Sequence, residues 1–226
     1  MNISYDLIIV ACSKNQELVN ITQRCIDSCL ADGADVNVII VETNGKKPLK
    51  YRGVNETIMY NGNFNYNRAL NLGLTKAKGN VHILANNDIV FESGWSKIGE
   101  QMKVNGYLSA SALSEDIRQR HCRKGDWIYE GYMIGTHITG WCLFVTKECI
   151  KKIGKLREDF EFWYSDNIYA DQIEQAGIKH GLFCNIFVNH ITSCTLKTMP
   201  VNTQRRLSYG AIHKYKIIKR EMNAKR

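Results

Sequence analysis

Three apolar runs of the sequence end in polar side chains that could bind a metal ion or a nucleotide. One run ends in Asn86, Asn87 and Asp88, and the other two end near Glu42 and His190. If these runs are parallel strands, their carboxyl ends meet at one edge of a sheet, where open α/β proteins bind nucleotides. Asp88 could ligate a divalent cation that bridges the two phosphates of a nucleotide diphosphate. His190 could supply a further ligand, which suits Mn²⁺ better than Ca²⁺ because imidazole is a softer donor than carboxylate.

Each of these residues also has an ordinary structural interpretation. Asn-Asn-Asp sequences are common in turns, and His190 could be a hydrogen-bonded histidine at the end of a strand. Glu42 could be a solvated strand end, whereas in a functional role it would accept hydrogen bonds from a ribose or a base. The chemistry therefore depends on whether the three positions converge.

Length and composition are typical of an ordinary globular protein. The chain has 226 residues, of which 44% are hydrophobic and only 2 are prolines, so that it can bury a substantial core. Its net charge is +8 at pH 7 and its pI is about 9.0. This balance indicates attraction to a polyanion such as nucleic acid, an acidic glycan or a membrane surface, or to a nucleotide substrate, although a basic solvated surface would look the same.

The sequence contains neither a membrane span nor an export signal. No segment approaches the roughly 20 apolar residues that a membrane-spanning helix needs, and Asp6 lies where a signal peptide would be basic. We therefore expect a cytoplasmic protein whose cysteines are reduced and mostly buried in the core, since no closely spaced doublets indicate zinc. The eight cysteines are Cys12, Cys25, Cys29, Cys122, Cys142, Cys149, Cys184 and Cys194.

Hydrophobic periodicity predicts alternating strands and helices in the first half of the chain. Asn65 is the expected N-cap of the second helix, and Gly79 is its expected stop signal. The order favours a mainly parallel central sheet flanked by helices, in a single α/β domain. The expected elements are a strand at 7–10, a helix at 18–30, strands at 36–41 and 56–60, a helix at 65–78 and a strand at 81–85.

The second half has weaker periodicity. Residues 114–135 contain charge, glycine and aromatic residues without any period, and we expect a long functional loop or lid there. The expected elements around it are a helix at 94–104, strands at 107–113 and 141–145, helices at 147–153 and 168–176, and a strand at 182–188 that ends at Asn189 and His190.

The block from Phe64 to Leu74, followed by the segment 77–79 and the Asn-Asn-Asp element, resembles glycosyltransferase family 2. The resemblance extends from Asp6 to about Thr195 and implies the GT-A (Rossmann-like) fold with a nucleotide diphosphate sugar as donor. It also implies Mn²⁺ or Mg²⁺ at the position of the family's DXD element, where only Asp88 is a carboxylate. From its place at a strand end, we expect His190 to be the second ligand. The residues expected to shape the donor site are Ala11, Ser13, Glu42, Asn67, Arg68, Asn71, Asn86 and Asn87.

A second block, from Phe162 to Asn167, resembles the family's Glu-Asp segment before a short helix. The resemblance places Asp166 at the catalytic base of inverting members, although Ser165 replaces the usual glutamate. Such a carboxylate would accept the proton of the attacking hydroxyl. The alternative is that Asp166 caps the helix that follows it. Aromatic faces pack against sugar rings, so Trp141, Trp163 and Tyr164 could line an acceptor site or could be ordinary core residues.

The C-terminal segment from Arg205 to Arg226 is basic, with Glu221 as its one acidic residue. Apolar residues between the cations predict a helix with an apolar side. It could be a solvated helix packed on the domain, or it could contact a polyanion such as the DNA backbone or an anionic membrane. We expect a domain at 1–204, with a nucleotide-sugar-binding half at about 1–112 and an acceptor-binding half at about 113–204, and a tail at 205–226.

These observations predict a glycosyltransferase, transferring a hexose or a pentose, that is metal-dependent and inverting. The acceptor could be a surface polysaccharide or lipid-linked glycan, or a hydroxymethylated base in DNA. Extrusion of such a base could use Trp127, Tyr129 and Tyr132 in the expected loop. The alternative from another class is a nonenzymatic nucleic-acid-binding protein on a degenerate nucleotide-binding fold. A nucleotidyltransferase is disfavoured, because the N-terminus lacks a glycine-rich, lysine-bearing phosphate loop.

Overall fold

The strands of the first half pair in parallel, as their alternation with helices predicts. The computed structural model describes residues 3–44, 50–191 and 201–224. The four strands are β1 (Tyr5–Ala11), β2 (Val36–Glu42), β3 (Glu56–Met59) and β4 (Val81–Asn86). β1 lies between β2 and β4, with Val10 opposite both Val41 and Asn86, and β3 pairs with β2. The carboxyl ends of these strands therefore lie at one edge of the sheet.

The strands of the second half make the sheet mixed. They are β5 (Ile89–Phe91), β6 (Ser109–Leu113), β7 (Ile128–Glu130), β8 (Cys142–Thr146) and β9 (His180–His190). The strand order is β3-β2-β1-β4-β8-β6-β9-β5, and β7 also pairs with β9. β8 is antiparallel to β4 and β6, whereas β6 and β9 are parallel. A parallel pair of strands needs a crossover connection, usually a helix. The antiparallel strands β6 and β8 need none, and no α-helix is present in the chain between them.

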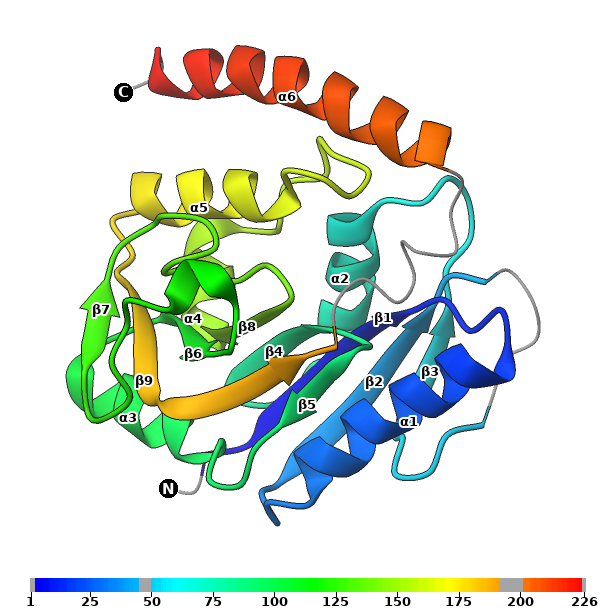
Figure 1. Cartoon of the computed structure of the whole chain (residues 1–226), viewed down its shortest axis with the longest axis vertical. Helices are drawn as coiled ribbons and strands as arrows, with labels where there is room; N and C mark the ends of the chain where they lie inside the picture. The colour runs from blue at the N-terminus through cyan, green and yellow to red at the C-terminus, as the bar shows by residue number, and fades with distance from the viewer. Residues whose placement is uncertain (1–2, 45–49, 192–200, 225–226) are drawn as a thin grey trace.

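Helices cover both faces of the sheet (Figure 1). Side chains alternate along β1, so that Leu7 and Ile9 pack in one core cluster with α1 and α3, and Ile8 and Val10 pack in a second with α2, α4 and α5. The sheet is therefore buried on both sides. The helices are α1 (Gln16–Leu30), α2 (Tyr66–Leu74), α3 (Lys97–Asn105), α4 (Lys147–Ile153), α5 (Ser165–Gln175) and α6 (Val201–Asn223).

The long loop expected at 114–135 is interrupted by two short elements. This segment contains the 3₁₀ turn η1 (Ile117–Gln119) and the strand β7, which pairs antiparallel with β9. Cys122 joins a small cluster with Leu182 and Cys184 beneath it. The two elements are only three residues long, too short for periodicity in the sequence to reveal them.

Buried Asp6 connects the amino ends of three parallel strands. Its carboxylate accepts hydrogen bonds from Asn37 Nδ2 in β2 at 2.7 Å and from the backbone N–H of Gly79 at 2.7 Å, and it lies 2.8 Å from His82 Nδ1 in β4. The N–H of Lys78 donates to it as well, at 3.0 Å. Burial alone would raise the pKa of the Asp6 carboxyl, but these hydrogen bonds have the larger combined effect and lower it.

Residue 79 must be a glycine, because its backbone lies close to the Asp6 carboxylate. The expectation that Gly79 ends a helix is wrong. α2 ends at Leu74, a full turn earlier, with Thr75 as its C-cap. A Cβ on Gly79 would lie 2.8 Å from the carbonyl oxygen of Ser4 and 3.0 Å from Asp6 Oδ2. Asn65, in contrast, is the N-cap as expected, because its side chain accepts from the N–H of Arg68 at 2.9 Å.

The predicted C-terminal helix is α6, which begins at Val201, before the expected start at 205. It packs on α5 through Ile218 and Met222, which form a cluster with Phe160 and Ile168. Lys219 Nζ also contacts Asp171 Oδ1 of α5 at 2.9 Å. Within the described ranges, no helix combines the length and apolar character needed to cross a bilayer.

The seven cysteines in the described part of the chain are free thiols, as expected, and Cys194 lies outside the described residues. All but Cys12 are buried. They therefore behave as small core residues.

We predict that Asp6→Asn lowers the free energy of unfolding by about 3 kcal/mol, because His82 and the two backbone donors lose a charged acceptor in a buried site. A carboxyl whose pKa is lowered on folding stabilises the protein above its unfolded pKa of about 3.9. That stability is lost as the pH falls through the folded value. Urea unfolding at a series of pH values measures both effects.

The matched control is Asp35→Asn, which makes the same chemical change at an exposed residue. Asp35→Asn should leave the free energy of unfolding within about 0.5 kcal/mol of wild type. Equal stability of the two variants at neutral pH would contradict the role assigned to Asp6.

Candidate active site

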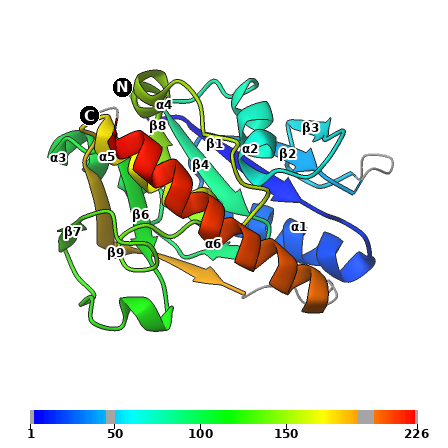
Figure 2. The same ribbon diagram turned by 90° about the horizontal axis from the view of Figure 1, so that it is seen from above.

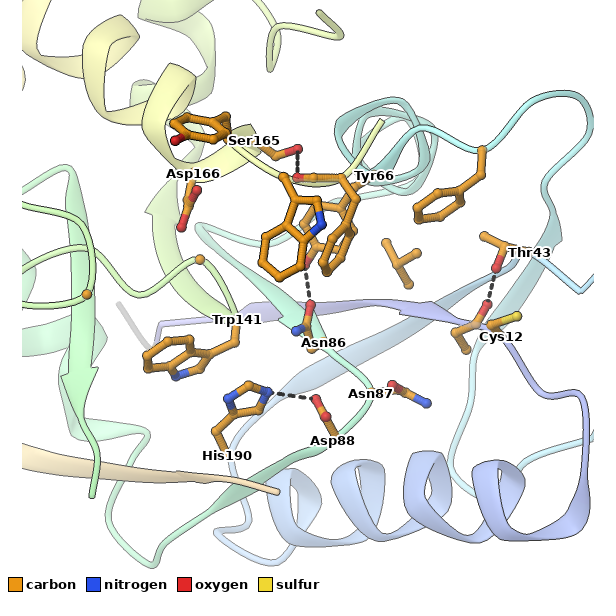
Figure 3. Close-up of a pocket in the computed structure, with 18 of the residues that line it drawn as sticks. Cys12, Thr43, Tyr66, Asn86, Asn87, Asp88, Trp141, Ser165, Asp166 and His190 are labelled. Atoms are coloured by element: carbon orange, nitrogen blue, oxygen red, sulfur yellow. Dashed lines mark hydrogen bonds and ion pairs between the residues drawn. The ribbon is translucent and has the colours of Figure 1, made fainter. Parts of the chain in front are cut away.

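A cavity of about 480 Å³ lies at the carboxyl ends of the parallel strands (Figure 3). Its size falls within the roughly 300–1,000 Å³ that is typical of ligand sites. The end of β1, the turn between β4 and β5, the first turn of α5 and the end of β9 all contribute to its lining. It brings together the following predicted site residues: Ala11, Asn86, Asn87, Asp88, Trp141, Trp163, Tyr164, Asp166 and His190.

The Asn-Asn-Asp turn is held from both sides of the sheet. Asn86 Oδ1 accepts a hydrogen bond from the hydroxyl of Tyr66 at 2.8 Å, and Asn87 Nδ2 donates to Thr22 Oγ1 at 3.0 Å. Burial raises the pKa of Tyr66, so its hydroxyl stays protonated and acts as a donor. The amides therefore have fixed orientations at the floor of the cavity, and Asp88 follows them immediately before β5.

Asp88 and His190 face each other although they are distant in sequence. His190 Nε2 lies 3.2 Å from Asp88 Oδ1. The contact follows from the antiparallel pairing of β5 with β9, in which Ile89 is opposite His190, and the N–H of Ile191 donates to the carbonyl oxygen of Asp88 at 2.9 Å. The ring of Trp141 stacks on the imidazole with centroids 4.9 Å apart and planes 14° apart, which fixes its orientation.

The Asp88 and His190 pair fits a divalent cation. A carboxylate oxygen and an imidazole nitrogen are ligands that Mn²⁺ accepts, and both side chains line the cavity. Among the described residues, no group of three or more His, Cys, Asp or Glu side chains could hold a metal ion. The described residues would thus supply two protein ligands, and ligands from outside the protein would have to complete a coordination shell.

Asp166 lies in the first turn of α5, so the alternative that it is the N-cap is wrong. Tyr164 occupies the cap position with φ of 69°, the one non-glycine residue with positive φ in the described ranges. Asp166 Oδ1 accepts from the N–H of Asn167 at 2.9 Å, and a Cβ on Gly140 would lie 2.7 Å from Asp166 Cβ. Burial raises the pKa of the Asp166 carboxyl, and the charge of Arg118 opposes this shift.

Aromatic side chains make up much of the remaining wall. Trp141 and Trp163 line the cavity, and the Nε1 atoms of both are buried without a hydrogen-bond partner among the described residues. Phe64 and Phe162, whose ring centroids are 6.5 Å apart, lie on the side of α2. A wall of this kind suits the apolar face of a sugar ring.

The amide side chains of α2 do not line the cavity, in contrast to their predicted position beside the nucleotide. Asn67 Nδ2 donates to the carbonyl oxygen of Arg157 at 2.8 Å. Asn71 donates to the carbonyl oxygen of Leu156 at 2.8 Å and accepts from its N–H at 3.0 Å. Arg68 forms an ion pair with Glu158 at 3.0 Å. This face of α2 therefore braces the segment 156–158, upstream of α5.

Glu42 and Ser13 lie behind the lining rather than in it. Glu42 is fully buried, and its Oε1 accepts from the N–H groups of Ser13 and Asn44, each at 3.0 Å. Oε2 is buried without a hydrogen-bond partner in the described ranges. Thr43 Oγ1 donates to the carbonyl oxygen of Ala11 at 2.8 Å. Glu42 thus joins the loops after β1 and β2, whose residues Ala11 and Thr43 line the cavity.

Sequence reasoning missed a charged pair in the cavity wall. Arg118 donates from Nε and Nη2 to the two carboxylate oxygens of Asp116 at 2.9 and 3.0 Å, and its guanidinium lies 5.3 Å from the centre of the Trp141 ring. Both residues occur in the aperiodic segment 114–135, which was expected to be functional, but nothing in their spacing distinguished them from its other charges. Tyr66 was also missed, although it lies within the block that resembles family 2.

Comparison with known proteins shows that the chain is similar in fold to a solved structure. No family model and no curated protein matches the chain. The solved structure of GalNAc-T7 with UDP, GalNAc and Mn²⁺ matches with a TM-score of 0.70 at 14% sequence identity, over 88% of this chain and 45% of that one. The chain thus spans less than half the length of the protein that it resembles. Membership of family 2 stays a prediction, and the chain has a GT-A-like fold, a single mixed α/β domain with helices on both sides of its sheet.

Proposed function

We propose that this protein is a metal-dependent glycosyltransferase that moves a sugar from a nucleotide diphosphate donor to a hydroxyl group. The observation that carries the proposal is the convergence of Asp88 and His190, 3.2 Å apart, with Asp166 in one cavity. In the view of Figure 3, Asp166 points into this cavity from above, and Asp88 and His190 lie below it. The likeness to GalNAc-T7, whose structure contains UDP, GalNAc and Mn²⁺, supports the same conclusion.

Asp88 and His190 would hold Mn²⁺ or Mg²⁺ together with the diphosphate of the donor. When bound, the ion neutralises the charge that develops on the departing diphosphate. Asn86, oriented by Tyr66, and Asn87, oriented by Thr22, would position the donor at the sheet edge. Because the hydrogen bonds of these amides are already made in the structure, little ordering would be needed when the donor binds.

Asp166 would accept the proton of the acceptor hydroxyl while that oxygen attacks the anomeric carbon. The new glycosidic bond forms as the bond from the anomeric carbon to the phosphate oxygen breaks, and the nucleoside diphosphate leaves with the electron pair. Attack from the face opposite the leaving group inverts the anomeric configuration. Burial makes Asp166 a better proton acceptor than a solvated aspartate, because it raises the pKa of the carboxyl.

The lining of the cavity favours a glycan hydroxyl as acceptor. Trp163 and Tyr164 lie in the wall near Asp166 and would provide apolar surface for a sugar, whereas the ring of Trp141 is already stacked on His190. Trp127, Tyr129 and Tyr132, which extrusion of a DNA base would need, are not part of the lining. Tyr132 donates its hydroxyl to the carbonyl oxygen of Ile178 at 2.9 Å, and Tyr129 belongs to β7.

We predict that Asp166→Asn lowers the transfer rate by about 10²–10⁴-fold, the usual contribution of a general base, and leaves donor affinity unchanged. Transfer is measured with a nucleotide sugar that stabilises the protein thermally in the presence of Mn²⁺, and donor affinity is measured by calorimetry.

Glu161→Gln is the matched control, because it neutralises an exposed carboxylate five residues before Asp166, and it should transfer at the wild-type rate. The wild-type rate should fall as the pH is lowered through the raised pKa of Asp166, and this acidic limb should be absent from the residual rate of Asp166→Asn. Near wild-type transfer by Asp166→Asn would show that another group is the base.

We predict that Mn²⁺ binds weakly alone and tightly with a nucleoside diphosphate, because the protein supplies only two ligands. The coupling is reciprocal, so Mn²⁺ should raise the affinity for UDP by the same factor. Asp88→Asn and His190→Ala should each lower the affinity for Mn²⁺ by more than the roughly 10–100-fold typical of an outer-shell partner. Calorimetry of Mn²⁺ with and without UDP, GDP, CDP, ADP or TDP measures both effects.

Glu115→Gln, an exposed carboxylate near the cavity, is the control and should bind Mn²⁺ and nucleotide as wild type does. Tight binding of Mn²⁺ without any nucleotide, or its persistence in Asp88→Asn, would contradict this site.

We predict that the sugar is transferred to a glycan, free or lipid-linked, and not to duplex DNA that contains hydroxymethylated bases. The two acceptors are offered separately with the same donor, and the products are identified by mass spectrometry. Transfer to the DNA would overturn the acceptor assignment but leave the donor site intact. Tight DNA binding without donor binding, hydrolysis or transfer would instead favour a nonenzymatic nucleic-acid-binding protein.

A further inference from the structure

α6 has two different faces. The row Ala211, Tyr215, Ile218 and Met222 packs toward the domain. Tyr209, Lys216 and Arg220 each lie two residues before a member of this row, about 200° around the helix at 3.6 residues per turn. They form what we call the outer face, together with Ile217.

The outer face is exposed and mixes cations with apolar side chains. Tyr209 is 73% exposed and Ile217 is 45% exposed. Lys216 and Arg220 are exposed and have no ion pair with any described residue. The whole helix has six Lys or Arg residues and one acidic residue, Glu221. Two of the cations, Lys214 and Lys219, bind the domain through the carbonyl oxygen of Asp159 and the carboxylate of Asp171.

No described element covers the outer face. α6 lies across the outside of α5 in Figure 1, and seen from above in Figure 2 it is the element nearest to the viewer. The helix has 23 residues, and so it is about 35 Å long at 1.5 Å per residue. It therefore offers a long and continuous surface for a partner of low curvature.

We propose that the outer face of α6 binds the surface of an anionic phospholipid membrane, with the helix lying in the plane of the headgroups. Lys216 and Arg220 would contact headgroup phosphates, and Tyr209 and Ile217 would enter the boundary between headgroups and acyl chains. This proposal goes beyond the transfer of a sugar and does not depend on it.

The apolar side chains favour a membrane over a nucleic acid. A phosphate backbone is bound by cations and leaves an isoleucine between them in water. A lipid interface binds the same cations and also removes the apolar side chains from water, and the ring and hydroxyl of tyrosine suit its two environments. Burial of Ile217 therefore contributes to binding at a lipid surface but not on a phosphate backbone.

The contacts of α6 connect the proposed membrane surface with the cavity. Tyr215, on the inner row of α6, lies with its ring centroid 5.0 Å from that of Tyr164, which lines the cavity. Packed helices have axes roughly 8–10 Å apart, so the cavity wall would lie about one helix layer from the lipid. If the proposed function holds, this position would give access to an acceptor that is itself carried on a lipid.

The test is co-sedimentation of the full chain with vesicles of phosphatidylcholine alone and of phosphatidylcholine mixed with phosphatidylglycerol. Wild type should bind the mixed vesicles and not the neutral ones. Lys216→Gln with Arg220→Gln should weaken binding about 30-fold, since each cation near an anionic surface contributes about a fivefold factor. Tyr209→Ser with Ile217→Ser should also weaken it, and this loss should persist at high salt, where the electrostatic contribution is screened.

The matched control is Lys97→Gln with Lys103→Gln, which removes the same charge from exposed positions on α3, on the other side of the sheet from α6 (Figure 1). This control should bind vesicles as wild type does. All variants should keep the wild-type melting temperature, and their stabilisation by UDP with Mn²⁺ should be unchanged. A failure of nucleotide binding would thus count against the proposed function and not against the membrane surface.

Three results would overturn the proposal. One is the absence of binding to the anionic vesicles, and another is equal loss of binding in the α3 and α6 charge variants, which would indicate attraction by net charge alone. The third is binding to duplex DNA at least as tight as to the vesicles, with no effect of Tyr209→Ser and Ile217→Ser on either. That result would make α6 a general polyanion contact.

Discussion

The antiparallel pairing of β5 with β9 is the interaction on which the site depends. Three residues of β5 pair with the end of β9, and Ile89 lies opposite His190. Because side chains alternate along a strand, a slip of one residue would turn the imidazole to the other face of the sheet and away from Asp88. The register is held by buried Ile89, Phe91 and Val188 in the main core cluster and by the stacking of Trp141 on His190. A contact between residues about one hundred positions apart is thus fixed by apolar packing around a very short strand.

The two halves of the sheet make different contributions to the cavity. The parallel half aligns the ends of β1, β2 and β4, and buried carboxylates stabilise its two edges: Asp6 joins the amino ends, and Glu42 joins the loops at the carboxyl ends. A buried carboxylate is tolerated only when hydrogen bonds replace its hydration, and for this reason both accept backbone N–H groups. The mixed half connects β6 to β8 without an α-helix, and Arg118, Trp141 and α5 form the second wall of the cavity.

The sequence predicted the elements with strong periodicity and the polar residues at their ends. Asn86, Asn87, Asp88 and His190 could be placed in advance because they follow long apolar runs, and Asp166 because it lies in a recognisable block. The amides of Asn67 and Asn71 were misplaced, since the family block identifies the helix but not which of its faces meets the cavity; the segment 156–158 occupies that face. Asp116 and Arg118 could not be found, because their position depends on contacts between distant parts of the chain, among them the pairing of β7 with β9. Arg118 also packs closely against Gly135, where an added Cβ would lie 2.6 Å from the Arg118 side chain.

The surroundings of Asp166 balance the two opposite requirements that its proposed role as a general base would impose. A carboxylate must be ionised to accept a proton, and yet it must hold that proton more tightly than a solvated aspartate does. Burial against Gly140 raises the pKa of Asp166, while the N–H of Asn167, the positive end of α5 and the charge of Arg118 stabilise the ionised form. Arg118 is itself held by Asp116, so its charge is partly neutralised and cannot lower the pKa as far as a free guanidinium would. Burial and the N–H of Asn167 therefore have the larger effects on the basicity of Asp166, and the Asp116 and Arg118 pair adds a smaller electrostatic contribution.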